Sequence, residues 1–208
     1  MFMTLTLTLT LTLTLTLTLT LTLTMSMSTP STRQLLAKGC EVVATHRGSA
    51  PPSELAALAD AEQRLTTMSL DVSDPVSVSA ASSQLRSSGS YIDAVIHNAG
   101  VYGPTVSLDG VARNGRAGAR PVTREDLLSV FETNAVGPLL VAQALAPLLE
   151  AQRESEPGKA LPVYAFLTSK VGSVEDNGSG GAYAYRASKS ALNIVAKVCL
   201  DPLSQPQP

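Results

Sequence analysis

The chain has 208 residues, of which 44% are hydrophobic and 15% charged, with a formal net charge of −2. This length suits one domain with a sizeable core. The balanced charge gives no indication of a polyanion partner such as nucleic acid, and the composition fits a globular cytoplasmic protein. The two cysteines, Cys40 and Cys199, are isolated, as expected for buried apolar residues in a reducing compartment. The two histidines, His46 and His97, are also far apart, so we expect no metal site.

The amino-terminal segment is a simple repeat in which Thr and Leu alternate from Thr4 to Thr24. A period of two suits a strand, but the run is much longer than a typical strand. Thr at every second position excludes a membrane span, and the segment lacks the basic start of a signal peptide. We therefore expect residues 1–30 to form a low-complexity extension that is disordered or poorly packed, with a long strand as the minority outcome.

Helices and strands alternate after Pro30. Apolar periodicity and turn residues predict strands at 40–46, 65–70 and 91–97, and helices at 31–38, 51–62 and 75–87. Strands that alternate with helices of this length predict a parallel sheet with right-handed crossovers. The expected fold class is α/β, a doubly wound parallel sheet that binds ligands beyond the carboxyl ends of its strands.

A long connection, rich in small residues, separates this half of the domain from the next. Thr123 and Asp126 have the spacing of a capping box, which predicts a helix beginning there. That helix is expected to continue to Leu149 with local distortion at Pro138 and Pro147. A strand at 161–167 and a helix at 182–199 follow. The sequence thus predicts one domain over residues 31–200 and a disordered tail over 201–208.

Tyr185 and Lys189 lie four residues apart on the last predicted helix, so their side chains share one face. A phenol has an ordinary pKa of about 10, and a nearby ammonium lowers that pKa by stabilising the phenolate. The pair is therefore a candidate general acid/base unit. A solvated Tyr–Lys pair without function would have the same spacing. The spacing alone therefore does not distinguish a catalytic pair from a solvated one, and other motifs of the chain are needed.

Five segments, in chain order, supply that context: Asp71-Val72, His97-Asn98-Ala99-Gly100, Asn134 within 133–138, Ser169 within 168–173, and Tyr185 to Lys189. Together they resemble the short-chain dehydrogenase/reductase family, most closely its small carbonyl reductases of the C-factor and sniffer type. The resemblance covers Ser31 to Cys199. It implies a Rossmann-like dinucleotide-binding domain and hydride transfer between a nicotinamide cofactor and a small-molecule carbonyl or alcohol.

The resemblance also implies catalytic roles for four residues. Tyr185 would donate a proton to the developing alkoxide, and Lys189 would lower the pKa of Tyr185 and hold the nicotinamide ribose. Ser169 would hydrogen-bond the substrate oxygen, with Ser173 as the runner-up for that role. Asn134 would support a water link to Lys189 and shape its own helix.

The implied cofactor is NADP rather than NAD, because Arg47 directly follows the second predicted strand and an Arg there can meet a ribose 2′-phosphate. A solvated loop charge is the alternative interpretation of Arg47. The full expected cofactor set is Arg47, Asp71, Val72, Asn98, Ala99, Gly100, Tyr185 and Lys189. His97 is expected to fill a position usually held by Asn, and Tyr164 and Tyr183, which have no Lys four residues later, to be packing residues.

The sequence departs from the family pattern in two places. The family opens with a strand and a turn, Thr-Gly-x-x-x-Gly-x-Gly, whose glycines let the backbone approach the pyrophosphate. Here the first glycine is Gly39, and the repeat and residues 25–30 occupy that place. The repeat can imitate the central strand, but its β-branched Thr residues cannot replace the glycine turn. At the other end, residues 200–208 stand where the last strands are expected.

Two functions follow from these observations. One is an NADP-dependent carbonyl reductase with no nucleic-acid or membrane partner. The other is a truncated, catalytically inactive relative without cofactor binding, at most an interaction module. The resemblance leaves the oligomeric state open between a monomer and a homodimer that pairs the helices of Asn134 and Tyr185.

Overall fold

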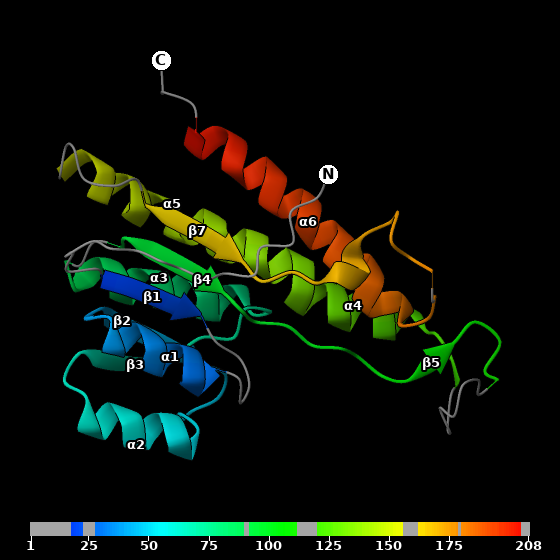
Figure 1. Ribbon diagram of the computed structural model, residues 1–208, viewed down its shortest axis with the longest axis horizontal. Coiled ribbons are helices and arrows are strands. Elements are labelled where there is room, and N and C mark those ends of the chain that lie inside the picture. Colours follow the sequence, from blue (N-terminus) through cyan, green and yellow to red (C-terminus); the bar gives the residue numbers. More distant parts are fainter. Residues whose placement is uncertain are drawn as a thin grey trace.

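The molecule is built on a five-stranded parallel sheet with the strand order β3-β2-β1-β4-β7 (Figure 1). The structure is a computed structural model that describes residues 18–22, 28–89, 92–111, 120–155, 162–178 and 180–204. The strands of the sheet are β1 (Thr18–Thr22), β2 (Glu41–His46), β3 (Leu65–Ser69), β4 (Ala94–His97) and β7 (Val163–Phe166). Both the parallel pairing and this crossover order agree with the predicted doubly wound α/β class.

The central strand, β1, comes from the Thr-Leu repeat. It pairs with β2 on one side and β4 on the other, and Thr20 is the partner of both Val43 and Val95. This differs from the expected boundaries, which assigned residues 1–30 to an extension outside the domain. The physical reason is that β2 and β4 each need a partner strand, and a β-branched residue at every second position suits one. The rest of the repeat lies outside the described residues.

The first half of the fold follows the predicted alternation of helices and strands. The helices are α1 (Ser28–Ala37), α2 (Ser53–Ala61) and α3 (Pro75–Ser87). Helix α1 begins three residues before the predicted start at Ser31. Helix α3 has the predicted bounds because Asp74 caps it, accepting a hydrogen bond from the backbone N–H of Val76, and Pro75 occupies its first turn.

A single long helical segment follows the connection, composed of α4 (Arg124–Phe131), a π-helical turn (η1, Glu132–Val136) and α5 (Gly137–Ser155). The predicted capping box is confirmed: Thr123 and Asp126 exchange hydrogen bonds between side chain and backbone at the start of α4. The irregular turn lies directly before Gly137-Pro138, close to the predicted distortion. At Gly137 a Cβ atom would lie 2.6 Å from the carbonyl oxygen of Val72, so this helix passes close to the end of β3.

The remaining elements are two short parallel strands in the connection, a 3₁₀ turn and the last helix. They are β5 (Val106–Ser107), β6 (Arg120–Pro121), η2 (Lys170–Gly172) and α6 (Tyr183–Ser204). The tail was expected to begin at residue 201, whereas α6 continues to Ser204. The remainder of that tail lies outside the described residues.

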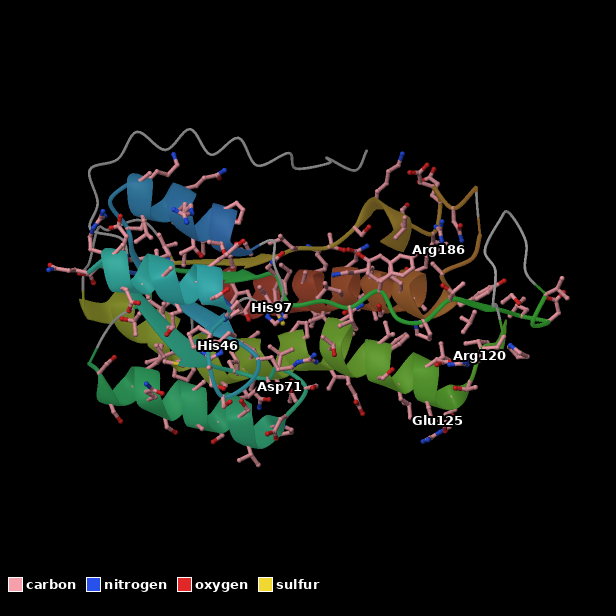
Figure 2. The ribbon with its side chains drawn as sticks, turned by 90° about the horizontal axis from the view of Figure 1, so that it is seen from below. His46, Asp71, His97, Arg120, Glu125 and Arg186 are labelled. Atoms are coloured by element: carbon pink, nitrogen blue, oxygen red, sulfur yellow. The ribbon has the colours of Figure 1, made fainter. Side chains whose placement is uncertain are left out.

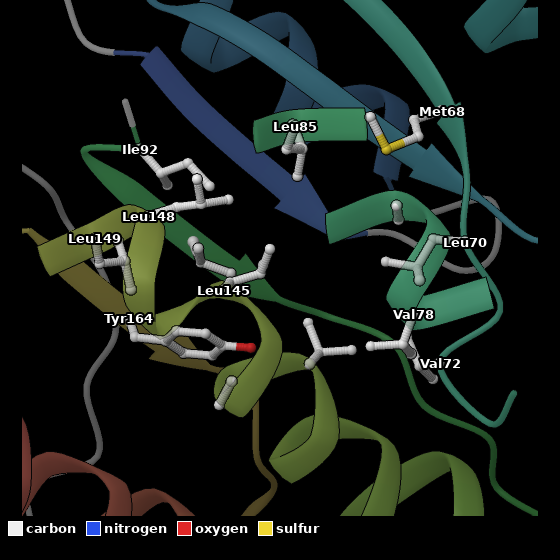
Figure 3. Packing of buried hydrophobic residues seen from close by; sticks show 14 of the residues in the cluster. Met68, Leu70, Val72, Val78, Leu85, Ile92, Leu145, Leu148, Leu149 and Tyr164 are labelled. Atoms are coloured by element: carbon white, nitrogen blue, oxygen red, sulfur yellow. The ribbon is translucent and has the colours of Figure 1, made fainter. Parts of the chain in front are cut away.

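Two apolar clusters form the core. Helices α3 and α5 pack on the sheet through one cluster, which Figure 3 shows around Leu85, Leu145 and Tyr164. Helices α1 and α2 contribute to the second, with Leu36, Leu55 and Leu58. Strand β4 serves both: Val95 belongs to the first cluster, whereas Ala94 and Ile96 pack against the second. Side chains that alternate in this way indicate that both faces of the sheet are covered.

This packing explains part of the apolar character of the α4–α5 segment. Arg124–Leu149 is long and apolar enough to cross a membrane by composition alone, and such a segment also occurs as a core helix of a globular protein. Here Val141, Leu145 and Leu149 are buried in the first cluster. The buried face of α5 therefore packs as a core helix does, whereas Leu127, Leu128 and Leu139 of the same segment are exposed.

Candidate active site

The predicted site residues gather where the parallel strands end. Strand β4 is followed by Asn98, Ala99 and Gly100, and β7 is followed by the segment that contains Ser169. Asp71 comes after β3, and the end of β3 lies beside the end of β2 (Figure 2). Helix α6 contacts α4, η1, α5 and η2. The fold therefore brings residues from distant parts of the sequence to one edge of the sheet.

Asn134 is fully buried in the π-helical turn and holds the loop after β4. Its side-chain amide donates to the carbonyl oxygen of Val101 at 2.8 Å and accepts from the backbone N–H of the same residue at 2.8 Å. The amide also donates to the hydroxyl of Ser188 on α6 at 3.0 Å. Both polar groups of the Val101 backbone are thus fixed, and this loop is tied to α6.

Lys189 is buried, with 4% of its surface exposed. Its ammonium donates to the carbonyl oxygen of Leu167, after β7, at 3.0 Å and lies 5.8 Å from the ring centre of Tyr185. Burial lowers the pKa of Lys189 below its ordinary value. A Cβ atom at Gly100 would lie 3.4 Å from both Lys189 Nζ and Asn134 Oδ1. The backbone of Gly100 therefore lies beside these two side chains.

The turn that carries Ser169 is fastened to the helix that carries Lys189. A Cβ atom at Gly172 would lie 2.8 Å from the carbonyl carbon of Lys189, so the turn and α6 are in close contact. Ser190 and Asn193 both donate to the carbonyl oxygen of Gly172, at 2.8 Å and 3.4 Å. These contacts fix Ser169 relative to the face of α6 that holds the candidate acid/base pair.

Ser169 and Ser173, the two candidates for the serine role, differ in their surroundings. The hydroxyl of Ser169 caps η2, accepting from the backbone N–H of Val171 at 3.4 Å. The hydroxyl of Ser173 accepts from the backbone N–H of Asp176 at 3.2 Å, in an exposed loop. Ser169 is three residues beyond the end of β7 and Ser173 is seven residues beyond it, which favours Ser169.

Tyr185 is half-buried on α6 and stacks on a second tyrosine. The ring centres of Tyr185 and Tyr102 are 4.8 Å apart, and the ring planes are inclined by 35°. Lys189 lies one turn further along α6. The structure therefore brings Asn134, Tyr185 and Lys189 together, with Ser169 on the attached turn.

The residues expected at the adenosine end lie at the ends of β2 and β3. Arg47 is exposed, and the carboxylate of Asp71 accepts hydrogen bonds from the backbone and hydroxyl of Ser73. Those bonds, with a smaller contribution from the charge of Arg47, lower the pKa of Asp71. The side chain of Val72 is buried in the first apolar cluster, so it packs the core rather than facing the strand ends.

His97 is the last residue of β4 and is almost completely buried. Neither ring nitrogen has a hydrogen-bond partner among the described residues. Burial, assisted by the charge of Lys189, lowers the pKa of His97 to about 3, so the ring is neutral near pH 7.

Tyr164 is a core residue, as predicted. No group of three or more potential metal ligands occurs in the described part of the chain.

Two contributors were not anticipated from the sequence. Ser188 is fully buried and receives the hydrogen bond from Asn134, and Tyr102 stacks on Tyr185. The only sign in the sequence that Tyr102 belongs to the site was its position two residues after Gly100. For Ser188 the only sign in the sequence was its position directly before Lys189. That it is the buried partner of Asn134 can be seen only in the fold.

The chain matches the family model described as short chain dehydrogenase over residues 28–206. It is 38% identical over 106 residues to the C-signal protein of Myxococcus xanthus, covering 51% of this chain and 53% of that protein. The chain spans about half the length of the curated relatives that it matches.

Two solved structures extend the similarity to three dimensions. The NADPH-bound carbonyl reductase from chicken fatty liver has a TM-score of 0.73 and 28% identity, covering 88% of this chain and 70% of that one. The carbonyl reductase Sniffer of D. melanogaster has a TM-score of 0.69 and 25% identity, covering 90% and 77%. The resemblance to the C-factor and sniffer type is therefore supported by both kinds of comparison.

Proposed function

Because the chain belongs to the short-chain dehydrogenase family, we propose that it is an NADP-dependent oxidoreductase that reduces the carbonyl group of a small molecule. The observation that carries the proposal is the arrangement of Tyr185 and Lys189 on α6, beside the loop that Asn134 holds. A phenol one helical turn from a buried ammonium is suited to donate a proton to an oxygen that becomes negative.

The residues present fit a nicotinamide cofactor at its two ends. Gly100, Tyr185 and Lys189 would hold the nicotinamide ribose, since a side chain at Gly100 would occupy the space beside Lys189. Arg47 and Asp71 would hold the adenosine end, and the positive charge of Arg47 favours a 2′-phosphate. The NADPH-bound state of the chicken carbonyl reductase supports the same choice. The cofactor, when bound, supplies the hydride.

Each side chain would then have a separate task. Tyr185 donates its proton to the substrate oxygen, and Lys189 stabilises the phenolate that remains. Ser169 donates a hydrogen bond to the same substrate oxygen and fixes its position. Asn134 keeps the loop after β4 in place through the backbone of Val101.

The alternative is a catalytically inactive relative that binds no cofactor. The absence of glycine before Gly39 favours it, because the pyrophosphate would have to approach a backbone segment that carries side chains. The retained contacts of Asn134 and Lys189 favour the enzyme instead. The two functions differ in one simple respect: only the enzyme binds NADPH.

We also propose a homodimer formed through the long helices. Apolar side chains are exposed on α4, α5 and α6, at Leu127, Leu128, Leu139, Ile194 and Val198. Exposed apolar residues on adjacent helices indicate an interaction surface.

The proposal is tested by titrating the protein with NADPH and with NADH, followed by NADPH oxidation with a panel of small aldehydes and ketones. We expect binding of NADPH in preference to NADH, and oxidation that requires a carbonyl substrate. Arg47→Ala should reduce the preference for NADPH, whereas Arg33→Ala on α1, also an exposed arginine, should not. Absence of NADPH binding would favour the inactive relative.

A further inference from the structure

Tyr102 has no role in the proposed proton transfer, yet it lies directly on the residue that performs it. Its ring centre is 4.8 Å from that of Tyr185. Tyr102 nevertheless remains 55% exposed. One part of the ring therefore covers Tyr185, and a large part remains free to contact another molecule.

The position of Tyr102 is fixed on both sides along the chain. Before it, both backbone polar groups of Val101 are bonded to the buried amide of Asn134. After it, Gly103 has a φ of +81°, and a Cβ atom there would lie 2.6 Å from a methyl group of Val130 on α4. Only glycine suits this conformation and this close approach. An exposed aromatic ring between two fixed neighbours is preorganised to bind.

We propose that Tyr102 is a specificity-determining residue that selects carbonyl substrates with an aromatic ring attached to the carbonyl carbon. The inference rests on the proposed function of Tyr185. A substrate whose oxygen accepts the proton of Tyr185 lies beside the ring of Tyr102, because the two rings are in contact. A flat aromatic group can stack on the exposed part of Tyr102, and a saturated ring of the same size cannot do so equally well.

The test compares two ketones of similar size, acetophenone and cyclohexyl methyl ketone. Their binding is measured by saturation-transfer NMR without cofactor and again with excess NADP⁺, which cannot reduce a ketone. We expect the wild type to bind acetophenone about threefold to tenfold more tightly, as one aromatic stacking contact allows. Tyr102→Phe should keep this preference. Tyr102→Leu and Tyr102→Ala should lose it, and the loss in Tyr102→Leu shows that the aromatic ring rather than bulk is responsible.

Leu108→Ala is the matched control, because Leu108 is 69% exposed in the same connection. It should leave the preference unchanged. Equal binding of the two ketones by the wild type, or an intact preference in Tyr102→Ala, would overturn the proposal. Turnover is measured separately by NADPH oxidation. A chain that shows the binding preference without turnover would refute the proposed reaction, and with it substrate selection by Tyr102, and would leave only an aromatic binding contact at this residue.

Discussion

At the scale of single residues, the site depends on an amide that can donate and accept at once. Asn134 donates to Val101 and Ser188 and accepts from Val101. An aspartate would have no donor for the carbonyl oxygen of Val101, and a leucine would leave both backbone groups buried without a partner. A single Asn in the π-helical turn therefore holds the loop after β4 in its shape.

His97 makes the stability of the protein depend on pH. Its ordinary pKa of 6.5 applies to the unfolded chain, and burial lowers the pKa to about 3 in the folded protein. Between these values the unfolded chain binds a proton that the folded chain does not, so the free energy of unfolding falls as the pH falls. The loss should be about 2 kcal/mol between pH 7 and pH 5.

His97→Asn removes this titration while keeping a polar side chain. We expect urea unfolding of the variant to show a pH dependence weaker by about 2 kcal/mol over that interval. His46, whose pKa is also lowered by burial, is present in both proteins and cancels in the comparison. Identical pH dependence of the two proteins would show that His97 does not titrate in this way.

At the scale of elements, the contact between η2 and α6 ties the turn that Ser169 caps to the helix that carries Tyr185 and Lys189. The sequence could predict the elements themselves, because Thr123 and Asp126 define one helix start and Asp74 and Pro75 another. It could not predict the contact at Gly172, because close approach of two backbones depends on the fold and has no local pattern.

Gly172→Ala tests this contact. The new methyl group would meet the backbone of Lys189 at 2.8–3.0 Å, so η2 must move away from α6. We expect a loss of about 1–3 kcal/mol in the free energy of unfolding and a lower kcat, measured by denaturant unfolding and NADPH oxidation. Gly178→Ala is the control in the same loop, where a Cβ atom meets nothing within 4 Å. Equal effects of the two substitutions would contradict the account.

At the scale of the whole molecule, the sheet is completed by a strand that the sequence could not place. A shift of the Thr-Leu repeat by two residues leaves every side-chain type on the same face, so the pattern contains no information about which five residues pair. The neighbouring strands β2 and β4 determine which residues of the repeat enter the sheet, and Thr20 pairs with both Val43 and Val95. The proposed catalytic residues could be named from the sequence because they belong to motifs that occur in a fixed order. Tyr102 and Ser188 could not, since only the fold brings them to their partners.

Thr20→Pro tests the central position of β1. Proline lacks the backbone N–H that a central strand needs for its ladder, so the variant should have a lower free energy of unfolding than the wild type. Thr20→Val, which keeps a β-branched residue, should retain the stability of the wild type. Thermal unfolding of the two variants gives the comparison, and a wild-type melting temperature for Thr20→Pro would exclude this strand from the sheet.

The proposed dimer predicts a molecular mass twice that of the chain in size-exclusion chromatography with light scattering. The double variant Ile194→Lys and Val198→Lys, on the exposed face of α6, should be monomeric because it places charges within an apolar contact. Val174→Lys, at a position that is 86% exposed in the loop before α6, should remain dimeric. A monomeric wild type would refute the dimer without affecting the proposed reaction.

We propose above that Tyr185 delivers the proton when NADPH reduces a carbonyl substrate. The most direct measurement follows the transfer of deuterium from the 4-position of labelled NADPH to the alcohol product, in the wild type and in Tyr185→Phe. We expect labelled alcohol from the wild type and a decrease of at least about 100-fold in the variant, with unchanged circular dichroism. Labelled product formed at the same rate by both proteins, or none formed by a folded wild type that binds NADPH, would contradict the account.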